Sequence, residues 1–237
     1  MKKNDFKRGL VAGIPICLGY LSVSFAFGIF AVESGLSVAE ALMISMTCVT
    51  SAGQLAAVPI IATAGGLVEL AISQLVINMR YALMSISLSQ KLDAEVPLAN
   101  RFAIAFVNTD EVFAVASSQK GSDSKWYMFG LLLTPWLGWS SGTLIGAVAG
   151  NVLPAIVTSS LGVAIYGMFI AIVVPEAKKS RPTALCVAIA VALSCLFYYV
   201  PGLNAIPSGF TIIVCAVAAS AIMAVAAPIP QEVEEDA

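Results

Sequence analysis

The chain contains no histidine and little charge. Of its 237 residues, 11% are Asp, Glu, Lys or Arg, whereas a soluble domain carries about 25%. Without histidine the chain lacks the commonest general base and metal ligand of proteins. Its five cysteines lie in apolar stretches without metal-ligand spacing, which indicates buried, inert thiols. We therefore expect neither an enzyme nor a cofactor.

What the sequence has is long apolar runs, and 59% of its residues are hydrophobic. A spanning helix needs roughly 20 mostly apolar residues, and about eight stretches qualify. The sequence therefore predicts an all-α, polytopic transmembrane bundle that forms a single integral membrane domain over residues 1–237. The predicted spans are Gly9–Val32, Val38–Thr63, Gly66–Ser89, Arg101–Ser118, Trp126–Asn151, Ala155–Val174, Thr183–Val200 and Ile206–Ala227.

The positive charges predict the orientation of these spans, because cytoplasmic loops are enriched in Lys and Arg. With residues 1–8 inside, most Lys and Arg fall on the cytoplasmic side, while Lys91 and Arg101 fall outside. Eight spans also place the acidic tail, residues 228–237, inside. The expected location is the cytoplasmic membrane. The cations on the inner side are Lys2, Lys3, Lys7, Arg8, Lys120, Lys125, Lys178, Lys179 and Arg181.

The second predicted span carries polar residues around its whole circumference, including Ser51 and Gln54. Gly53 weakens a helix, and Pro59 removes a main-chain hydrogen bond. Unwound backbone at membrane depth is tolerated where it lines a cavity. The pattern therefore favours a broken helix at a substrate site over a kinked, buried structural helix.

The third predicted span orders its polar residues in two stripes. Asn78 and Tyr81 belong to one stripe and Arg80 to the other. One stripe can line a cavity while the other meets a neighbouring helix. For the hydroxyl groups, interhelical hydrogen bonding is an equal alternative, whereas Asn78 and Arg80 favour a function.

The fourth predicted span is short and carries Asp110 and Glu111 near its middle. A charge at the bilayer centre costs about 2.5–3.5 kcal/mol even on the lenient scale. One acid can form a structural ion pair with Arg80, and the other can face water or substrate and couple transport to protons. A re-entrant segment is a further alternative, which would lower the count to seven spans.

The fifth predicted span has a small residue at every fourth position, including Gly138, Gly142, Gly146 and Gly150. Such a stripe lets a neighbouring helix approach closely, and we interpret it as helix packing. Trp136 and Trp139 indicate an interfacial belt near the inner end. A weak likeness between the first and fifth spans suggests an internal repeat.

Five short segments together resemble the AzlC family, the large subunit of branched-chain amino acid exporters. The resemblance is clearest between Gly9 and Val115, and beyond that the chain matches in hydropathy and length. The matching segments are Gly13-Ile14-Pro15, Phe25-Ala26-Phe27-Gly28, Ser51-Ala52-Gly53-Gln54, Asn78-Met79-Arg80-Tyr81 and Thr109-Asp110-Glu111.

This resemblance implies export of leucine, isoleucine and valine together with a small AzlD-like membrane subunit. The leading hypothesis is a secondary transporter coupled to an ion or proton gradient. The alternative is a non-transporting membrane scaffold, in which the polar residues hold helices together. The predicted substrate-binding residues are Ser51, Gly53, Gln54, Asn78 and Tyr81, and the predicted coupling or ion-pair residues are Arg80, Asp110 and Glu111.

Overall fold

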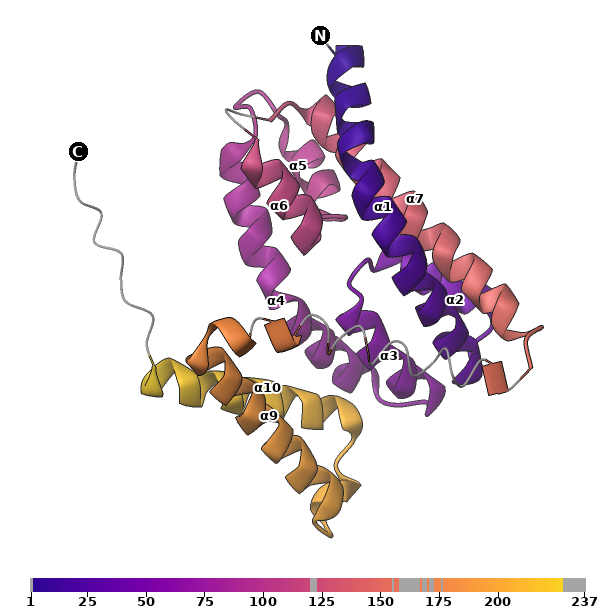
Figure 1. Ribbon diagram of the computed structural model, residues 1–237, viewed down its shortest axis with the longest axis vertical. Coiled ribbons are helices and arrows are strands. Elements are labelled where there is room, and N and C mark those ends of the chain that lie inside the picture. Colours follow the sequence, from indigo (N-terminus) through magenta and orange to yellow (C-terminus); the bar gives the residue numbers. More distant parts are fainter. Residues whose placement is uncertain are drawn as a thin grey trace.

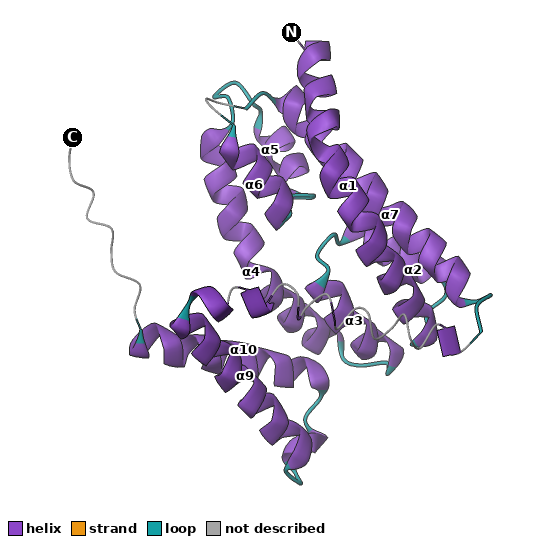
Figure 2. Ribbon diagram, in the orientation of Figure 1, coloured by secondary structure: helices purple, strands orange, loops and turns teal. Residues whose placement is uncertain are grey.

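The computed structural model of the chain describes residues 2–119, 123–154 and 177–227, with isolated positions between 156 and 175. The described part is helical, and no strand is drawn in it (Figure 2). Its elements are α1 Lys2–Glu33, α2 Val38–Thr47, α3 Ala52–Ala62, α4 Leu67–Lys91, α5 Leu98–Ala105, α6 Asp110–Ser118, α7 Lys125–Gly150, α9 Arg181–Tyr199, η1 Leu203–Ala205 and α10 Ser208–Ala226.

Five of the described helices, α1, α4, α7, α9 and α10, are long and apolar enough to cross a membrane. The prediction of an all-α membrane protein is therefore confirmed. Most of the predicted span Ala155–Val174 lies outside the described residues, as do Lys120 and the acidic tail 228–237.

Helices α1 and α7 form the most closely packed pair and run side by side in the same direction (Figure 1). A Cβ added at Gly138, Gly142 or Gly146 would collide with the α1 backbone at Cys17, Leu21 or Phe25, and one at Gly150 would meet Val32. The glycine stripe of α7 thus lies against α1, where the missing side chains allow main chains to touch. The parallel direction is consistent with an internal repeat, which stays a prediction.

The segment of residues 38–62 is a hairpin of two half-length helices, here called the α2–α3 hairpin. The chain leaves α2 at Cys48 and enters α3 after Ser51. Val58 of α3 packs in one cluster with Leu36, which precedes α2, and with Ala41 in the first turns of α2, so the hairpin returns to the end at which it began. The predicted broken helix is confirmed, but the break lies at residues 48–51 and Pro59 is inside α3.

Residues 98–118 form a second hairpin of half-length helices, the α5–α6 hairpin. At its start, the Arg101 guanidinium donates to the Ser89 carbonyl near the C-terminal end of α4. At its finish, the Lys91 ammonium donates to the carbonyls of Ala116 and Ser117, at 2.7 and 2.6 Å. Both ends of this hairpin therefore lie beside the C-terminal end of α4, which supports the re-entrant alternative over a single crossing.

The two hairpins enter the bundle from opposite ends (Figure 1). The C-terminal end of α4 lies beside the start of α7, because Asp123 exchanges main-chain hydrogen bonds with Lys91 and Asp93. Ser124 in turn donates to Asp5 in the first turn of α1. We call this end, which carries Lys7, Arg8, Lys91 and Arg101, the basic end. The expectation that Lys91 and Arg101 lie opposite the N-terminus is wrong, because it counted both hairpins as complete crossings.

Candidate functional site

The tips of both hairpins meet at a cavity of about 710 Å³ in the middle of the bundle. Helices α1, α4 and α7 supply its other walls. One part of the lining is polar, and the rest is apolar side chains such as Ile16, Val23, Val49 and Ile77. The polar lining consists of Ser51, Arg80, Tyr81, Thr109, Asp110 and Glu111, together with the ring hydroxyl of Tyr20.

The α2–α3 hairpin presents the N-terminus of α3 to this cavity. Ser51 precedes α3 with a φ of 26°, a left-handed conformation that is rare outside glycine, and its side chain does not cap the helix. Such strain is found mainly at functional sites. A helix N-terminus carries unpaired N–H groups and a partial positive charge, so it attracts an anion.

The α5–α6 hairpin presents the N-terminus of α6 from the other direction. Thr109 caps α6 by accepting a hydrogen bond from the Val112 N–H. The Tyr20 hydroxyl lies 2.7 Å from the Thr109 hydroxyl and also contacts the Glu111 carboxylate, to which it donates. Tyr20 thereby ties the middle of α1 to this tip.

Arg80 of α4 and Asp110 of α6 carry opposite charges and contact each other in the lining of the cavity. Their side chains form an ion pair with an N–O distance of 2.6 Å, and both are about half exposed. The Arg80 guanidinium also lies 4.8 Å from the centre of the Tyr81 ring and donates to its hydroxyl at 3.1 Å. The ring and the carboxylate together fix the position of the guanidinium.

Gln54 lies behind the cavity wall and not in it. Its side chain is fully buried, donates to the Ser45 hydroxyl at 2.9 Å and accepts from the Trp139 indole N–H at 2.9 Å. Ser45 continues this chain of bonds to Thr143 of α7 at 2.7 Å. Buried polar networks of this kind fix one arrangement of a core. The structure therefore gives Gln54 the role of fastening the α2–α3 hairpin to α7.

Asn78 and Gly53 also lie outside the cavity lining, at the contact between α3 and α4. Gln74 donates to the Gly53 carbonyl at 2.9 Å, and Asn78 donates to Gln74 at 3.1 Å. A Cβ at Gly53 would collide with the Thr50 hydroxyl and crowd Gln74, so the glycine permits this close approach. Of the predicted substrate-binding residues, Ser51 and Tyr81 line the cavity, as do all three predicted coupling residues.

Tyr20 is a site residue that was not predicted, and Trp139 was predicted to lie in an interfacial belt. Trp139 is 2% exposed and its ring packs edge-on to that of Tyr20 at 5.1 Å, so it lines the cavity and does not belong to an interfacial belt. Both aromatic residues sit within apolar runs and act through residues more than 80 positions away. A polar-tipped aromatic side chain at the middle of a span was the available signal.

The fold and candidate site define a helical membrane protein in which two half-length hairpins meet at a partly polar cavity in the middle of the bundle. Interrupted helices that line a cavity in this way are found in transporters. Among the described residues no group of His, Cys, Asp and Glu is arranged to hold a metal ion. The chain belongs to the AzlC family, because the profile of the AzlC protein matches residues 15–153. This match runs from Pro15 in α1 to the end of α7 and therefore includes both hairpins.

Several relatives match most of the chain. An uncharacterized membrane protein of Archaeoglobus fulgidus is 31% identical over 81% of this chain and 85% of its own length. The inner membrane protein YgaZ of Escherichia coli is 30% identical over 77% of this chain and 76% of its own. The branched-chain amino acid transport protein AzlC of Bacillus subtilis is 24% identical over 74% and 69%. No solved structure gives a significant match to the chain.

Proposed function

We propose that this chain is a secondary transporter that exports branched-chain amino acids across the cytoplasmic membrane, with both termini inside. The name of the Bacillus subtilis relative supports the substrate class. The observation that carries the proposal is the central cavity, where an Arg–Asp pair and two helix N-termini stand beside an apolar wall. Coupling to an ion or proton gradient and a small AzlD-like partner subunit belong to the same proposal.

A free amino acid is a zwitterion, and the cavity offers a partner for each of its charges. The Arg80 guanidinium and the N-terminus of α3 suit the carboxylate. The Asp110 carboxylate suits the ammonium group. The side chains of Ile16, Val23 and Ile77 surround the remaining space, where a branched aliphatic side chain is removed from water.

Substrate binding replaces the ion pair in this proposal. Arg80 and Asp110 contact each other at 2.6 Å in the structure, so each charge is compensated while the site is empty. An incoming zwitterion supplies a carboxylate to Arg80 and an ammonium to Asp110, and the pair separates without leaving an unpaired charge. Ligands with one charge leave one of the two residues unpaired and bind more weakly.

For proton coupling the geometry favours Glu111 over Asp110, the reverse of the weak preference from the sequence. Asp110 is engaged by a cation, whereas the partner of Glu111 is the neutral hydroxyl of Tyr20. A carboxylate without a cationic partner at mid-membrane is the usual proton carrier of transporters. Glu111→Gln should leave exchange of substrate intact but abolish its accumulation against a gradient.

The test is ligand-dependent thermal stabilisation of the purified chain, because a ligand that binds the native state raises its apparent stability. We expect leucine to stabilise the protein more than 4-methylpentanoate, which lacks the ammonium, or isoamylamine, which lacks the carboxylate. Asp110→Asn should remove the preference for leucine over 4-methylpentanoate. Glu33→Gln, an exposed acid outside the cavity, is the matched control and should bind like the wild type.

Transport itself is measured as counterflow of radiolabelled leucine in liposomes that contain the chain. Uptake by the wild type and its loss in Asp110→Asn support the proposal. If no amino acid stabilises the chain and no counterflow occurs, with or without a partner subunit, the proposal is overturned in favour of the non-transporting scaffold.

A further inference from the structure

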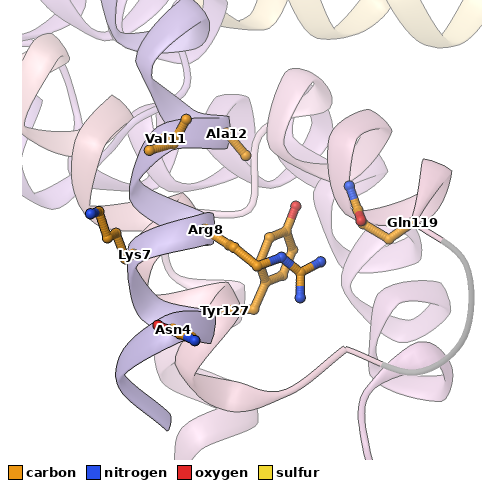
Figure 3. A pocket seen from close by; sticks show the side chains of 7 residues that line it. All are labelled: Asn4, Lys7, Arg8, Val11, Ala12, Gln119 and Tyr127. Atoms are coloured by element: carbon orange, nitrogen blue, oxygen red, sulfur yellow. The ribbon is translucent and has the colours of Figure 1, made fainter. Parts of the chain in front are cut away.

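A second cavity, of about 490 Å³, opens at the basic end of the bundle. On α1 its lining ends at Ala12, and that of the central site begins at Pro15. It lies between the first turns of α1, the start of α7 and the residue that follows α6. Figure 3 shows the side chains of Asn4, Lys7 and Arg8 from α1, Gln119 after α6 and Tyr127 from α7 around it. The proposed transport function uses none of these residues.

The cavity carries positive charge that the surrounding acids compensate incompletely. Arg8 lies 3.6 Å from Asp5 in an ion pair whose Arg8 side chain is exposed, and such a pair contributes little to stability. The Arg8 guanidinium also lies 5.7 Å from the centre of the Tyr127 ring. Lys7 forms no ion pair within the described residues. Asp123 is the other nearby acid, and burial raises the pKa of its carboxyl, although the charges of Lys91 and Arg8 oppose the rise.

The Tyr127 hydroxyl is a buried donor without an acceptor. Tyr127 is 5% exposed, and within the described residues its hydroxyl has no hydrogen-bond partner. A buried polar group without a partner costs about 1–3 kcal/mol. An oxygen-rich ligand in this cavity would accept its proton.

An apolar stripe on α1 leads away from the cavity. Lys7, Val11, Ile14 and Leu18 follow one another at spacings of four, three and four residues, which places them on one helix face. Val11, Ile14 and Leu18 are 57%, 46% and 63% exposed. A cation above an exposed apolar stripe matches the two parts of a phospholipid, a charged headgroup and an acyl chain.

We propose that this cavity binds the headgroup phosphate of an anionic membrane phospholipid. The Lys7 ammonium and the Arg8 guanidinium neutralise the phosphate, the Tyr127 hydroxyl donates to one of its oxygens, and an acyl chain lies along Val11, Ile14 and Leu18. The bound lipid then joins the start of α1 to the start of α7 and to the end of the α5–α6 hairpin at Gln119.

The test compares the thermal stability of the purified full chain in detergent with added phosphatidylglycerol, phosphatidylcholine or inorganic phosphate. The double variant Lys7→Gln/Arg8→Gln removes both cations. The matched control Lys178→Gln/Arg181→Gln removes two exposed cations that do not line the cavity. Tyr127→Phe deletes only a hydroxyl that has no partner in the part of the chain that the structure describes, so it should fold normally.

We expect phosphatidylglycerol to raise the melting temperature of the wild type and of the control by several degrees, and the other two additives to raise it less. The rise should vanish in Lys7→Gln/Arg8→Gln and shrink in Tyr127→Phe. Equal stabilisation by phosphatidylcholine, or a full response in both cavity variants, would overturn the proposal. An equal response to inorganic phosphate would overturn the lipid as occupant in favour of a soluble anion.

Discussion

The α2–α3 and α5–α6 hairpins reach the same cavity from opposite ends, but different forces hold them. The α2–α3 hairpin is fastened to α7 by buried, neutral hydrogen bonds through Gln54, Ser45 and Trp139. The α5–α6 hairpin is held at its base by the cations Lys91 and Arg101. At its tip it depends on the half-exposed pair between Arg80 and Asp110.

This difference assigns different roles to the two hairpins. Breaking a buried, fully paired network is costly, so the α2–α3 hairpin should stay fixed to α1 and α7. A partly exposed ion pair is worth little to stability, and a zwitterion can take the place of either partner. We therefore expect the α5–α6 hairpin to be the part that responds to substrate.

The largest expected effect on stability is that of Gln54→Leu. The change leaves the Trp139 indole N–H buried without an acceptor, at a cost of about 1–3 kcal/mol, and also removes the bond to Ser45. The melting temperature in detergent measures the loss. Gln90→Leu removes an exposed amide on α4 and should be close to neutral. Equal melting temperatures for the two variants would show that the network does not hold the hairpin.

Gly142→Ala tests the packing of α7 against α1, both of which contact α2. The new methyl group would meet the Leu21 carbonyl and the Ser24 hydroxyl of α1, so we expect a loss of about 1–3 kcal/mol from overpacking. Gly19→Ala is the control, because its Cβ would have no neighbour within 4 Å among the described residues. There the usual helix preference for alanine should give a gain of about 0.5–1 kcal/mol. A gain at both positions would show that α1 and α7 are not in main-chain contact.

A smaller effect is expected from Lys91→Met at the base of the α5–α6 hairpin. The variant loses ammonium bonds to the carbonyls of Ala116, Ser117 and Gln119. Water can replace the donor at the exposed bond to Ser117, so we expect a loss of about 1 kcal/mol. Hydrogen exchange should accelerate in α6 and not in α3. Lys3→Met, at an exposed position on α1, is the control. Faster exchange in both hairpins would contradict separate anchoring.

The smallest stability effect concerns the tip of the α5–α6 hairpin. In a double-mutant cycle with Arg80→Gln and Asp110→Asn, we expect a coupling energy of about 0.2–1 kcal/mol, the usual range for exposed ion pairs. Leucine binding should nevertheless fall sharply in both single variants. A coupling energy of several kcal/mol with unchanged binding would make the pair structural, as one interpretation of the sequence had it.

The sequence predicted the helical membrane fold and the broken second segment because these depend on local signals, namely long apolar runs and polar residues on every face. It could not show that the α2–α3 and α5–α6 segments turn back, since a half-length hairpin and a full span have the same total length. Lys91 and Arg101 were placed at the wrong end for this reason.

The residues of the candidate site were predicted in part. Charged residues within apolar runs, such as Arg80 and Asp110, are visible in the sequence because charge is costly there, and the structure brings them together. Gln54 looked equally suitable, but only the tertiary structure shows that Ser45 and Trp139 already satisfy its amide. Tyr20 was missed because a tyrosine in an apolar helix is unremarkable until its partner, on the distant α6, is known.

The central claim is that the two hairpins enter from opposite sides and return to the side from which they came. The direct test is labelling of single cysteines by an impermeant reagent in intact cells, in a Cys-free background. We expect Thr63→Cys to be labelled like Glu33→Cys, and Glu95→Cys to be labelled like Asn4→Cys. If Thr63→Cys is instead labelled like Asn4→Cys, and Glu95→Cys like Glu33→Cys, both segments cross the membrane completely, which contradicts the arrangement of two returning hairpins.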